Sequence, residues 1–301
     1  DEHDLISLKD ALNKIHFSDG IGELNQAIHR LKFDEHFFLQ LLMALRKRSL
    51  QHSGSLPLPD IGPYFKLISE TLDFELTDAQ KKVIKEIHSD LKNPIPMNRL
   101  LQGDVGSGKT IVSILISALA VGNNAQVAMM VPTEILATQH FHSFKSELEK
   151  VNIPCALLVG NMKKLDRSPI LAGLENGKIP MVIGTHALIQ EDVNFKNLGL
   201  VIVDEQHRFG VNQRAKLVEK GNNPHFLAMT ATPIPRTLSI TYHGDMDLSI
   251  IDEMPANRIP VVTKVVEPSR LGKVYKFIKD EVAAGRQCMV IYPLVEESEK
   301  S

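Results

Sequence analysis

Short apolar runs alternate with longer amphipathic stretches between about residue 77 and residue 230 of this chain. The short runs are nearly continuous in apolar residues, and helix-like stretches such as TEILATQHFHSFKSELEK separate them. Strands of that composition are typical of a parallel sheet that helices cover on both faces. The pattern therefore predicts a doubly wound α/β domain whose strands read RLLQ, QVAMMV, CALLVG, PMVIG, LGLVIVD and HFLAMT.

An amphipathic helix precedes this domain in the segment RLKFDEHFFLQLLMALRKRS. Acidic residues lie early and basic residues late in it, and apolar residues recur at helical spacing, which favours a helix. The apolar positions are Phe37, Phe38, Leu41, Leu42 and Leu45. Gly and Pro then interrupt the chain in SGSLPLPDIGP, so we expect a connector and a domain boundary near residues 55 to 70.

After DEMPANRIP, which is rich in turn-forming residues, the strand and helix pattern begins again. A β-rich run VVTKVVEP, a helical RLGKVYKFIKDEVAAG and a strand-like QCMVIYPLV follow in that order. These elements are too few to close a core, so they predict only the start of a second α/β unit. The expected divisions of the chain are a helical segment at 1–65, the α/β domain at 66–255 and this start at 256–301.

Composition places the chain among ordinary globular proteins. Of its 301 residues 43% are hydrophobic, and 34 basic against 36 acidic residues give a formal net charge of -2, so any nucleic-acid binding would be local. Cys155 and Cys288 form no metal-type pair, which favours a reducing cytosol. The longest apolar stretch is too short to span a bilayer, so we expect a cytoplasmic protein without membrane contact. The start at Asp1 indicates an excised fragment.

The strongest local signal is GDVGSGKT, which fits the phosphate-binding loop pattern between the predicted strand RLLQ and the helical TIVSILISALA. Backbone N–H groups of such a loop converge with a helix N-terminus on phosphate oxygens. Lys109 would neutralise the β- and γ-phosphates, and the Thr110 hydroxyl would take one position on Mg²⁺. The alternative is a glycine-rich turn with a solvated lysine. The expected phosphate-contacting residues are Gly103, Asp104, Val105, Gly106, Ser107, Gly108, Lys109 and Thr110.

Two adjacent carboxylates end the predicted strand LGLVIVD, in the stretch VIVDEQHRFG. We expect Asp204 to hold Mg²⁺ at the carboxyl edge of the sheet, and Glu205 to orient or deprotonate the attacking water. The alternative is a polar strand end without chemistry. Gln206 and His207 have no second His or Cys at ligand spacing, so coupling of the site to its neighbours is a better interpretation than zinc binding.

Two further segments are weaker signals. In MTATPIPRTL, Thr230 and Thr232 follow the predicted strand HFLAM, which places their hydroxyls at the edge that carries Asp204. In FELTDAQ, the Gln80 amide can both donate to and accept from an adenine edge. The alternative there is that Thr77 is a plain helix cap and Gln80 a surface residue.

Taken in order, FELTDAQ, GDVGSGKT, VPTEILATQH, GTHALIQ, VIVDEQHRFG and MTATPIPRTL resemble the early motifs of superfamily 2 helicases. DEQHRFGVNQR, TATPIPRTL and GDMDLSIIDEMPANRIPV resemble the RecG-type branch-migrating DNA helicases, as does the helical RLKFDEHFFLQLL. The resemblance covers nearly the whole chain. It implies a motor of two RecA-like domains that hydrolyses ATP and drives double-stranded DNA, regressing stalled replication forks and migrating Holliday junctions in repair and recombination.

By motif matching, the resemblance assigns roles to individual residues. The nucleotide and magnesium residues are Lys109, Thr110, Asp204 and Glu205, the adenine reader is Gln80, and the coupling residues are Gln206, His207, Thr230 and Thr232. The residues expected to touch the DNA backbone are Pro132, Thr133, Glu134, Gly184, Thr185 and His186. Amides, hydroxyls and helix N-termini can hold phosphates without a basic field, which suits the near-neutral charge.

The chain departs from the family in two ways. It lacks the family's N-terminal DNA-wedge domain, so we expect fork-specific binding to be lost. It also lacks most of the second RecA-like domain, with the motifs that supply an arginine finger. Such a finger contributes roughly 10³ to 10⁵ in rate in other nucleotide hydrolases, so we expect this chain alone to bind ATP weakly and to hydrolyse it hardly at all.

Three other readings stay open. Transcription-repair coupling translocases share TATPIPRTL, but they usually carry a second Glu where this chain has Gln206, and they lack the N-terminal segment. A nucleotide-gated interaction module would bind partners without a motor cycle, and DNA would then leave its nucleotide affinity unchanged. A metabolic P-loop kinase would need a small-substrate site and a lid that the sequence does not offer.

Overall fold

The computed structural model describes residues 4–51, 54–205, 209–232, 246–255 and 261–291 of the chain. The chain folds into two compact units, Asp1–Ala256 and Asn257–Ser301. Within the described ranges, none of the helices has the length and apolar character needed to cross a membrane.

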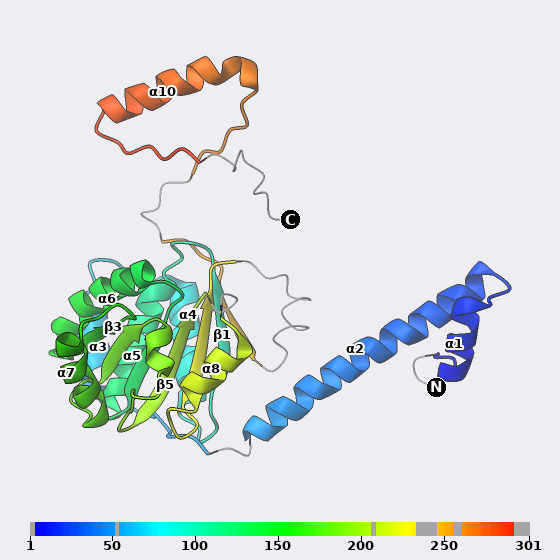
Figure 1. Ribbon diagram of the computed structural model, residues 1–301, viewed down its shortest axis with the longest axis horizontal. Helices are drawn as coiled ribbons and strands as arrows, with labels where there is room; N and C mark the ends of the chain where they lie inside the picture. Colours follow the sequence, from blue (N-terminus) through cyan, green and yellow to red (C-terminus); the bar gives the residue numbers. More distant parts are fainter. Residues whose placement is uncertain (1–3, 52–53, 206–208, 233–245, 256–260, 292–301) are drawn as a thin grey trace. The chain divides into compact units, whose positions relative to one another are not determined.

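A sheet of seven strands forms the centre of the first unit, in the order β3-β4-β2-β5-β6-β1-β7 (Figure 1). Every pair of neighbouring strands runs parallel. The strands are β1 (Asn98–Gly103), β2 (Gln126–Met130), β3 (Cys155–Leu158), β4 (Met181–Gly184), β5 (Leu198–Asp204), β6 (His225–Thr230) and β7 (Asp247–Ile251). The predicted apolar runs correspond to β1 through β6, so the expected parallel α/β sheet is confirmed.

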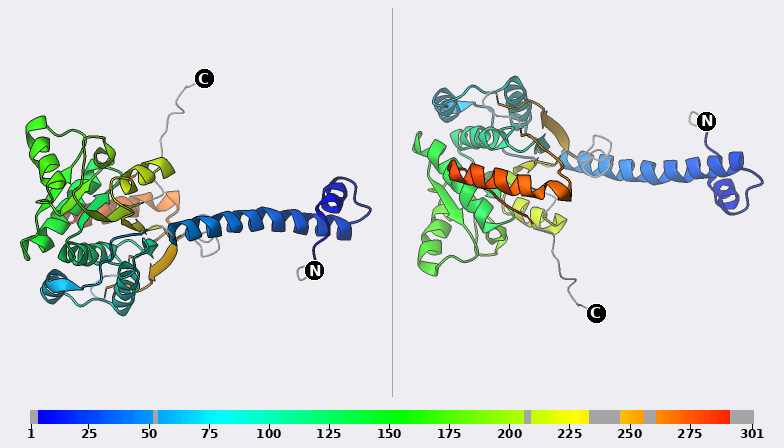
Figure 2. Two further views of the ribbon diagram at one scale, coloured as in Figure 1. Left: turned by 90° about the horizontal axis from the view of Figure 1, so that it is seen from below. Right: turned by 90° about the horizontal axis from the view of Figure 1, so that it is seen from above.

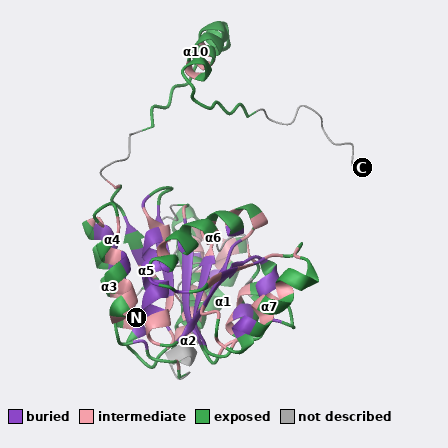
Figure 3. Ribbon diagram, turned by 90° about the vertical axis from the view of Figure 1, so that its left-hand side faces the viewer, coloured by how far each residue is buried: buried purple, intermediate pink, exposed green. Residues whose placement is uncertain are grey.

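Helices cover both faces of this sheet, because successive side chains of each strand point to opposite apolar layers. Met129 of β2 lies in the layer with α3, α4, α5 and α6, whereas Met130 lies in the layer with α7, α8 and the 3-10 helix η1. Figure 3 shows the buried strands between these partly exposed helices. Their bounds are α3 (Gly62–Glu70), α4 (Asp78–Leu91), α5 (Lys109–Gly122), α6 (Glu134–Glu149), α7 (Lys164–Glu175), α8 (Val211–Val218) and η1 (His186–Ile189).

Helix α5 is buried from Ile111 to Ala120, as expected of a helix that is apolar on nearly all sides. The serines that interrupt its apolar run bond backward along the helix. The Ser113 hydroxyl donates to the Thr110 carbonyl, and the Ser117 hydroxyl donates to the Ser113 carbonyl, each at 2.7 Å. The hydroxyls are therefore satisfied inside the core, and α5 holds the loop before it against the sheet.

The expected connector around residues 54–61 has no helix or strand, but it is packed. Leu58 is fully buried, and its N–H donates to the Leu91 carbonyl at 2.7 Å. The Ser55 N–H donates to the Pro94 carbonyl at the same distance, 2.7 Å. The chain is thus bonded to the sheet's layers from Ser55 onward.

Two helices precede this segment, α1 (Leu8–His16) and α2 (Ile21–Gln51). They pack through Ala11 and Ala27, both fully buried, and through a Lys14–Glu23 ion pair at 2.9 Å. The predicted helix is confirmed as part of α2, which is one unbroken helix that begins earlier than expected (Figure 2). Its predicted apolar positions, among them Phe38, are exposed.

The second unit corrects two strand predictions. Its described elements are a 3-10 helix η3 (Pro268–Arg270) and the expected helix α10 (Leu271–Ala283), but 261–267 of VVTKVVEP and 287–291 of QCMVIYPLV form no strand. Val261 is 81% exposed and Val265 fully exposed. A strand needs a partner for its backbone groups and cover for one face, and the described part of this unit supplies neither.

One strand was missed. β7 pairs with β1 at the edge of the sheet, and its burial alternates along its length. The acids and proline that flank DLSII favoured a turn, because an edge strand that is exposed on one side lacks the continuous apolar run of a central strand.

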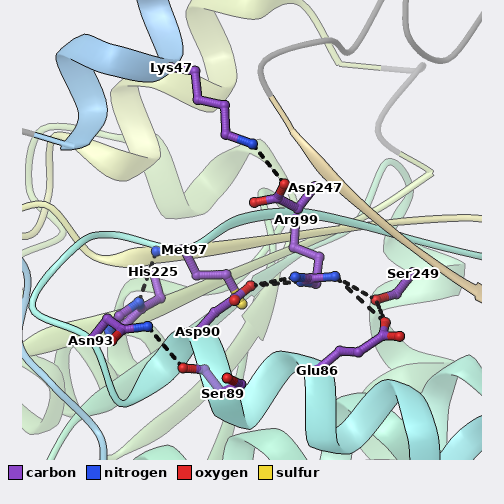
Figure 4. A network of polar contacts seen from close by, with 10 residues as sticks. All are labelled: Lys47, Glu86, Ser89, Asp90, Asn93, Met97, Arg99, His225, Asp247 and Ser249. Atoms are coloured by element: carbon purple, nitrogen blue, oxygen red, sulfur yellow. Dashed lines mark hydrogen bonds and ion pairs between the residues drawn. The ribbon is translucent and has the colours of Figure 1, made fainter.

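A buried arginine on β1 joins the edge of the sheet to α4 (Figure 4). Arg99 is 9% exposed, and its Nε donates to Asp90 of α4 at 2.7 Å. Its Nη1 donates to the Ser249 hydroxyl of β7 at 2.8 Å, and that hydroxyl donates to Glu86 of α4. This network is what fastens β7 and α4 to β1 by polar contacts.

Replacing Arg99 with methionine keeps the apolar stem but removes the donors to Asp90 and Ser249. We expect the free energy of unfolding to fall by about 2–3 kcal/mol, less than for a fully buried pair, because water reaches part of Asp90. Urea denaturation followed by circular dichroism measures this. The matched control is Lys47→Met. Lys47 pairs with Asp247 at 2.8 Å, with both side chains more than 40% exposed. Its loss should cost less than about 1 kcal/mol. Equal losses in the two variants would contradict the role given to Arg99.

A buried histidine anchors the packed connector segment. His225 of β6 is fully buried; the Met97 N–H donates to its Nδ1 at 3.0 Å, and its Nε2 lies 2.8 Å from the Leu56 carbonyl. An amide only donates and a carbonyl only accepts, so the ring is neutral with its hydrogen on Nε2. Burial lowers the pKa of His225, although the Leu56 carbonyl acts to raise it.

Acid should therefore weaken the fold through His225. The unfolded histidine binds a proton near pH 6.5 and the folded one only at lower pH, so this stabilisation is complete above about pH 6.5 and is lost as pH falls below it. Free energies of unfolding between pH 7.5 and 5 for the wild type and His225→Asn measure the effect. We expect the variant to be less stable at pH 7.5, with a slope reduced by at most about 1.4 kcal/mol per pH unit. An unchanged slope would show that His225 does not titrate on unfolding.

Candidate active site at the carboxyl edge of the sheet

The loop between β1 and α5 has backbone that only glycine adopts without strain. Gly106 and Gly108 have φ angles of 81° and 89°, and a Cβ atom at Gly108 would overlap the side-chain amide of Gln80. A Cβ atom at Gly103 would overlap the Ser107 hydroxyl. The glycines of GDVGSGKT therefore let the loop turn tightly over the start of α5, as a phosphate-binding loop requires. We call residues 103–110 the P-loop.

Lys109 lies half-buried at the base of this loop. Its Nζ donates to the carbonyls of Gly103 and Asp104, at 2.7 and 3.0 Å. Burial lowers the pKa of Lys109, and the nearby carboxylates of Asp204 and Glu205 act to raise it. A partly desolvated ammonium that bonds only weakly polar carbonyls gains free energy from an anionic ligand, and phosphate oxygens would supply that charge.

The predicted carboxylates lie where β5 ends. Asp204 is 13% exposed in its side chain, and its Oδ1 accepts the Glu205 N–H at 3.0 Å. Glu205 has φ 52°, in the left-handed region that costs a non-glycine residue about 1–2 kcal/mol. This turn points the two successive carboxylates in different directions, as different roles at a strand end require.

Sequence reasoning missed the second partner of Asp204. The Nε2 of His140 lies 2.9 Å from Asp204 Oδ2, and the imidazole is 11% exposed. His140 belongs to α6, which follows β2, the neighbour of β5 in the sheet. The segment VPTEILATQH carried a signal that was not used, since its final histidine falls on the same helical stripe as the buried Ala137.

Gln80 lies against the P-loop rather than on the surface. It is 1% exposed, and its amide oxygen accepts the Thr77 N–H at 2.9 Å while its amide nitrogen donates to the Ser107 carbonyl at 2.8 Å. Thr77 caps α4, so both alternatives weighed for this pair are partly met. Glu253, another residue that sequence reasoning missed, accepts the Ala79 N–H at 3.0 Å. Adenine reading by Gln80 stays a prediction.

The two threonines of MTATPIPRTL lie beside the carboxylates. Thr230 ends β6, which pairs Met229 with Asp204, and its hydroxyl is 2.9 Å from that of Thr232. Thr230 is 1% exposed and Thr232 is exposed. Gln206 and His207 lie outside the described residues, so their coupling role stays a prediction.

The residues expected to touch DNA come together at the ends of β2 and β4. The Val131 N–H donates to the Gly184 carbonyl at 2.9 Å, and Thr133 caps α6 by accepting the Leu136 N–H. Glu134 starts that helix and accepts from Asn161 of the loop after β3 at 3.5 Å. These contacts join the segment around Pro132 to the end of β4.

Thr185 and His186 follow β4 directly. Thr185 is 2% exposed, and its hydroxyl oxygen has no hydrogen-bond partner among the described residues. His186 begins η1. A Cβ atom at Gly184 would overlap the Leu158 carbonyl, so glycine there permits close strand contact. The predicted DNA residues therefore form one continuous edge next to the P-loop side of the sheet.

The residues present fit a magnesium–nucleotide complex better than a protein-only metal site. Among the described residues, no group of three His, Cys, Asp or Glu side chains could hold a metal. Mg²⁺ bound with nucleotide phosphates keeps several waters and needs only one or two protein oxygens, which Thr110 and Asp204 offer. The glycine turns and the desolvated Lys109 fit the phosphates.

Comparisons with known proteins agree with this geometry. Residues 77–240, more than half of the chain, match the family of DEAD/DEAH box helicases. The ATP-dependent DNA helicase RecG of Synechocystis sp. is 48% identical over 301 residues, which is 100% of this chain and 36% of that protein. RecG of Thermotoga maritima is 46% identical over 98% of this chain and 38% of its own length.

A solved structure of RecG bound to a three-way DNA junction superposes with a TM-score of 0.86 at 43% identity, covering 98% of this chain and 40% of that one. The chain thus spans roughly two fifths of the length of these relatives. The fold, the glycine-lined loop and the paired carboxylates lead to the same conclusion as the comparisons: the chain belongs to the DEAD/DEAH box helicase family, has its RecA-like fold, and is similar over its whole length to RecG helicases.

Proposed function

We propose that this chain is the first motor domain of an ATP-dependent DNA helicase or translocase that acts on branched DNA. Its tasks would be replication-fork regression and Holliday-junction branch migration during repair and recombination in the bacterial cytosol. The observation that carries the proposal is the meeting of Lys109, Asp204 and the 131–134 segment at one sheet edge. The similarity to RecG, which has been solved with a three-way DNA junction, supports branched DNA as partner.

The P-loop would bind the phosphates of ATP through its backbone N–H groups, with Lys109 neutralising their charge. Thr110 and Asp204 would hold Mg²⁺, which neutralises charge as the terminal phosphate leaves. Glu205 would orient or deprotonate the attacking water, since its backbone turns it away from Asp204. Thr230 and Thr232, at the adjoining strand end, would report the state of the nucleotide by hydrogen bonding.

DNA would be held by its backbone at the ends of β2 and β4. Helix N-termini, amides and hydroxyls there read shape rather than sequence, which agrees with a formal net charge of -2. The candidate groups are the start of α6 at Thr133, the buried hydroxyl of Thr185 and the side chain of His186. An edge that adjoins the nucleotide site lets hydrolysis change the grip on DNA.

The first test is Lys109→Ala in the full-length protein. We expect DNA-stimulated ATP hydrolysis to fall roughly 10²- to 10³-fold, because a positioned charge on the phosphates is lost. Steady-state hydrolysis with and without forked DNA measures it. Lys145→Ala is the matched control, since Lys145 lies on the exposed side of α6 and pairs only with Glu149 at 3.5 Å.

Three results would decide among the readings. Full hydrolysis by Lys109→Ala would refute the proposed mechanism. Nucleotide binding that DNA does not affect, in a wild type without hydrolysis, would favour the nucleotide-gated binding module. Hydrolysis stimulated by linear and branched DNA alike would separate a general double-stranded DNA translocase from an enzyme of branched DNA.

The second test is Gly108→Ala, which puts a Cβ atom at φ 89° against Gln80. Strain of about 1–2 kcal/mol is expected in the loop, with at least a tenfold loss of affinity for ATP as the amides move away from the phosphates. Fluorescence anisotropy of a labelled ATP analogue measures the affinity. Gly210→Ala is the control, because Gly210 has φ -64° and open space where a Cβ would lie. Undiminished binding by Gly108→Ala would show that the loop does not cradle the phosphates.

A further inference from the structure

The contact between His140 and Asp204 is the polar contact that reaches the candidate magnesium ligand from another element. His140 Nε2 and Asp204 Oδ2 are 2.9 Å apart, with side chains 11% and 13% exposed. The other carboxylate oxygen, Oδ1, accepts the Glu205 N–H. Each oxygen of Asp204 therefore has a donor, and together the two donors fix the plane of the carboxylate.

Packing holds the imidazole in place from below. Ala137 and Phe144, one helical turn before and after it on α6, are fully buried. The ring of His140 meets that of Phe144 at a centroid distance of 6.5 Å and an angle of 69°, an edge-to-face arrangement. The histidine is thus a polar residue on the apolar stripe of α6, aimed at the end of β5.

Burial of an imidazole costs free energy, and an apolar residue would serve the packing of α6 as well. The polar atom faces Asp204, the residue whose orientation the proposed nucleotide site needs. Groups that bond a metal ligand from behind fix its direction, and their removal typically lowers metal affinity or activity about 10- to 100-fold.

We propose that His140 is a positioning residue that orients the Asp204 carboxylate for the magnesium–nucleotide complex. This inference rests on the proposed nucleotide function, but it adds a residue outside the P-loop and the VIVDEQHRFG stretch. His140 acts through Asp204 and does not itself contact the nucleotide.

The test compares His140→Leu, His140→Gln and the wild type in the full-length protein. Leucine keeps volume and helix propensity but has no donor, whereas the amide nitrogen of glutamine can donate from a similar reach. The readout is the Mg²⁺ concentration that half-saturates binding of a nonhydrolysable fluorescent ATP analogue, with a parallel measurement in EDTA. We expect the Mg²⁺ requirement of His140→Leu to rise about 10- to 100-fold, with affinity in EDTA unchanged and His140→Gln close to wild type.

His142→Leu is the matched control, because His142 lies on the same helix with its side chain exposed. A thermal melt of each variant measures the purely structural effect. If His140→Leu changes the melting temperature but not the Mg²⁺ requirement, the positioning role is wrong and the residue only packs. Loss of binding in EDTA as well as in Mg²⁺ by both His140 variants would equally overturn it.

Lys109→Ala separates this inference from the proposed function. Wild-type nucleotide binding by Lys109→Ala would remove the nucleotide site itself. Loss of binding by Lys109→Ala together with an unchanged Mg²⁺ requirement in His140→Leu would leave that site in place and refute only the role of His140.

Discussion

Parallel hydrogen bonding from β1 through β6 and β5 to β2 is the interaction on which the site depends. Parallel strands all end at the same edge, so residues far apart in the chain meet there. The register pairs Gln102 with Thr230 and Asp204 with Met229, which sets the P-loop, the threonines and the carboxylates at one depth. A slip of one residue would turn Asp204 toward the opposite layer and dissolve the site.

Local patterns predicted much of this arrangement, for a physical reason. Central parallel strands are buried on both faces, so they appear as continuous apolar runs, and the P-loop is contiguous in the chain. His140 and Arg99 could not be recognised in the same way. Their partners depend on which strands become neighbours, and the strand order β2-β5 and β1-β7 is decided by packing across the whole sheet. Buried polar contacts at long sequence separation are therefore the part of the site that local patterns leave out.

The strand errors have the same origin. VVTKVVEP has high strand propensity, yet Val265 is fully exposed and no strand forms, because propensity acts only where a partner strand and an apolar face are present. DLSII has weaker propensity but forms β7, since β1 offers its edge and Arg99 holds Ser249 at 2.8 Å. Tertiary contacts decide both cases, in opposite directions.

Helix α6 ties the two halves of the proposed mechanism together mechanically. Its first turn, capped by Thr133, belongs to the candidate DNA edge, and the distance from Glu134 to His140 is roughly 9 Å at 1.5 Å per residue. A close-packed helix moves as a body, so a shift of its start also displaces His140. The bond to Asp204 is 2.9 Å long, and a hydrogen bond is lost beyond roughly 3.5 Å, so a displacement of less than an ångström suffices to release the carboxylate. DNA contact and nucleotide chemistry would then communicate through one helix and one hydrogen bond.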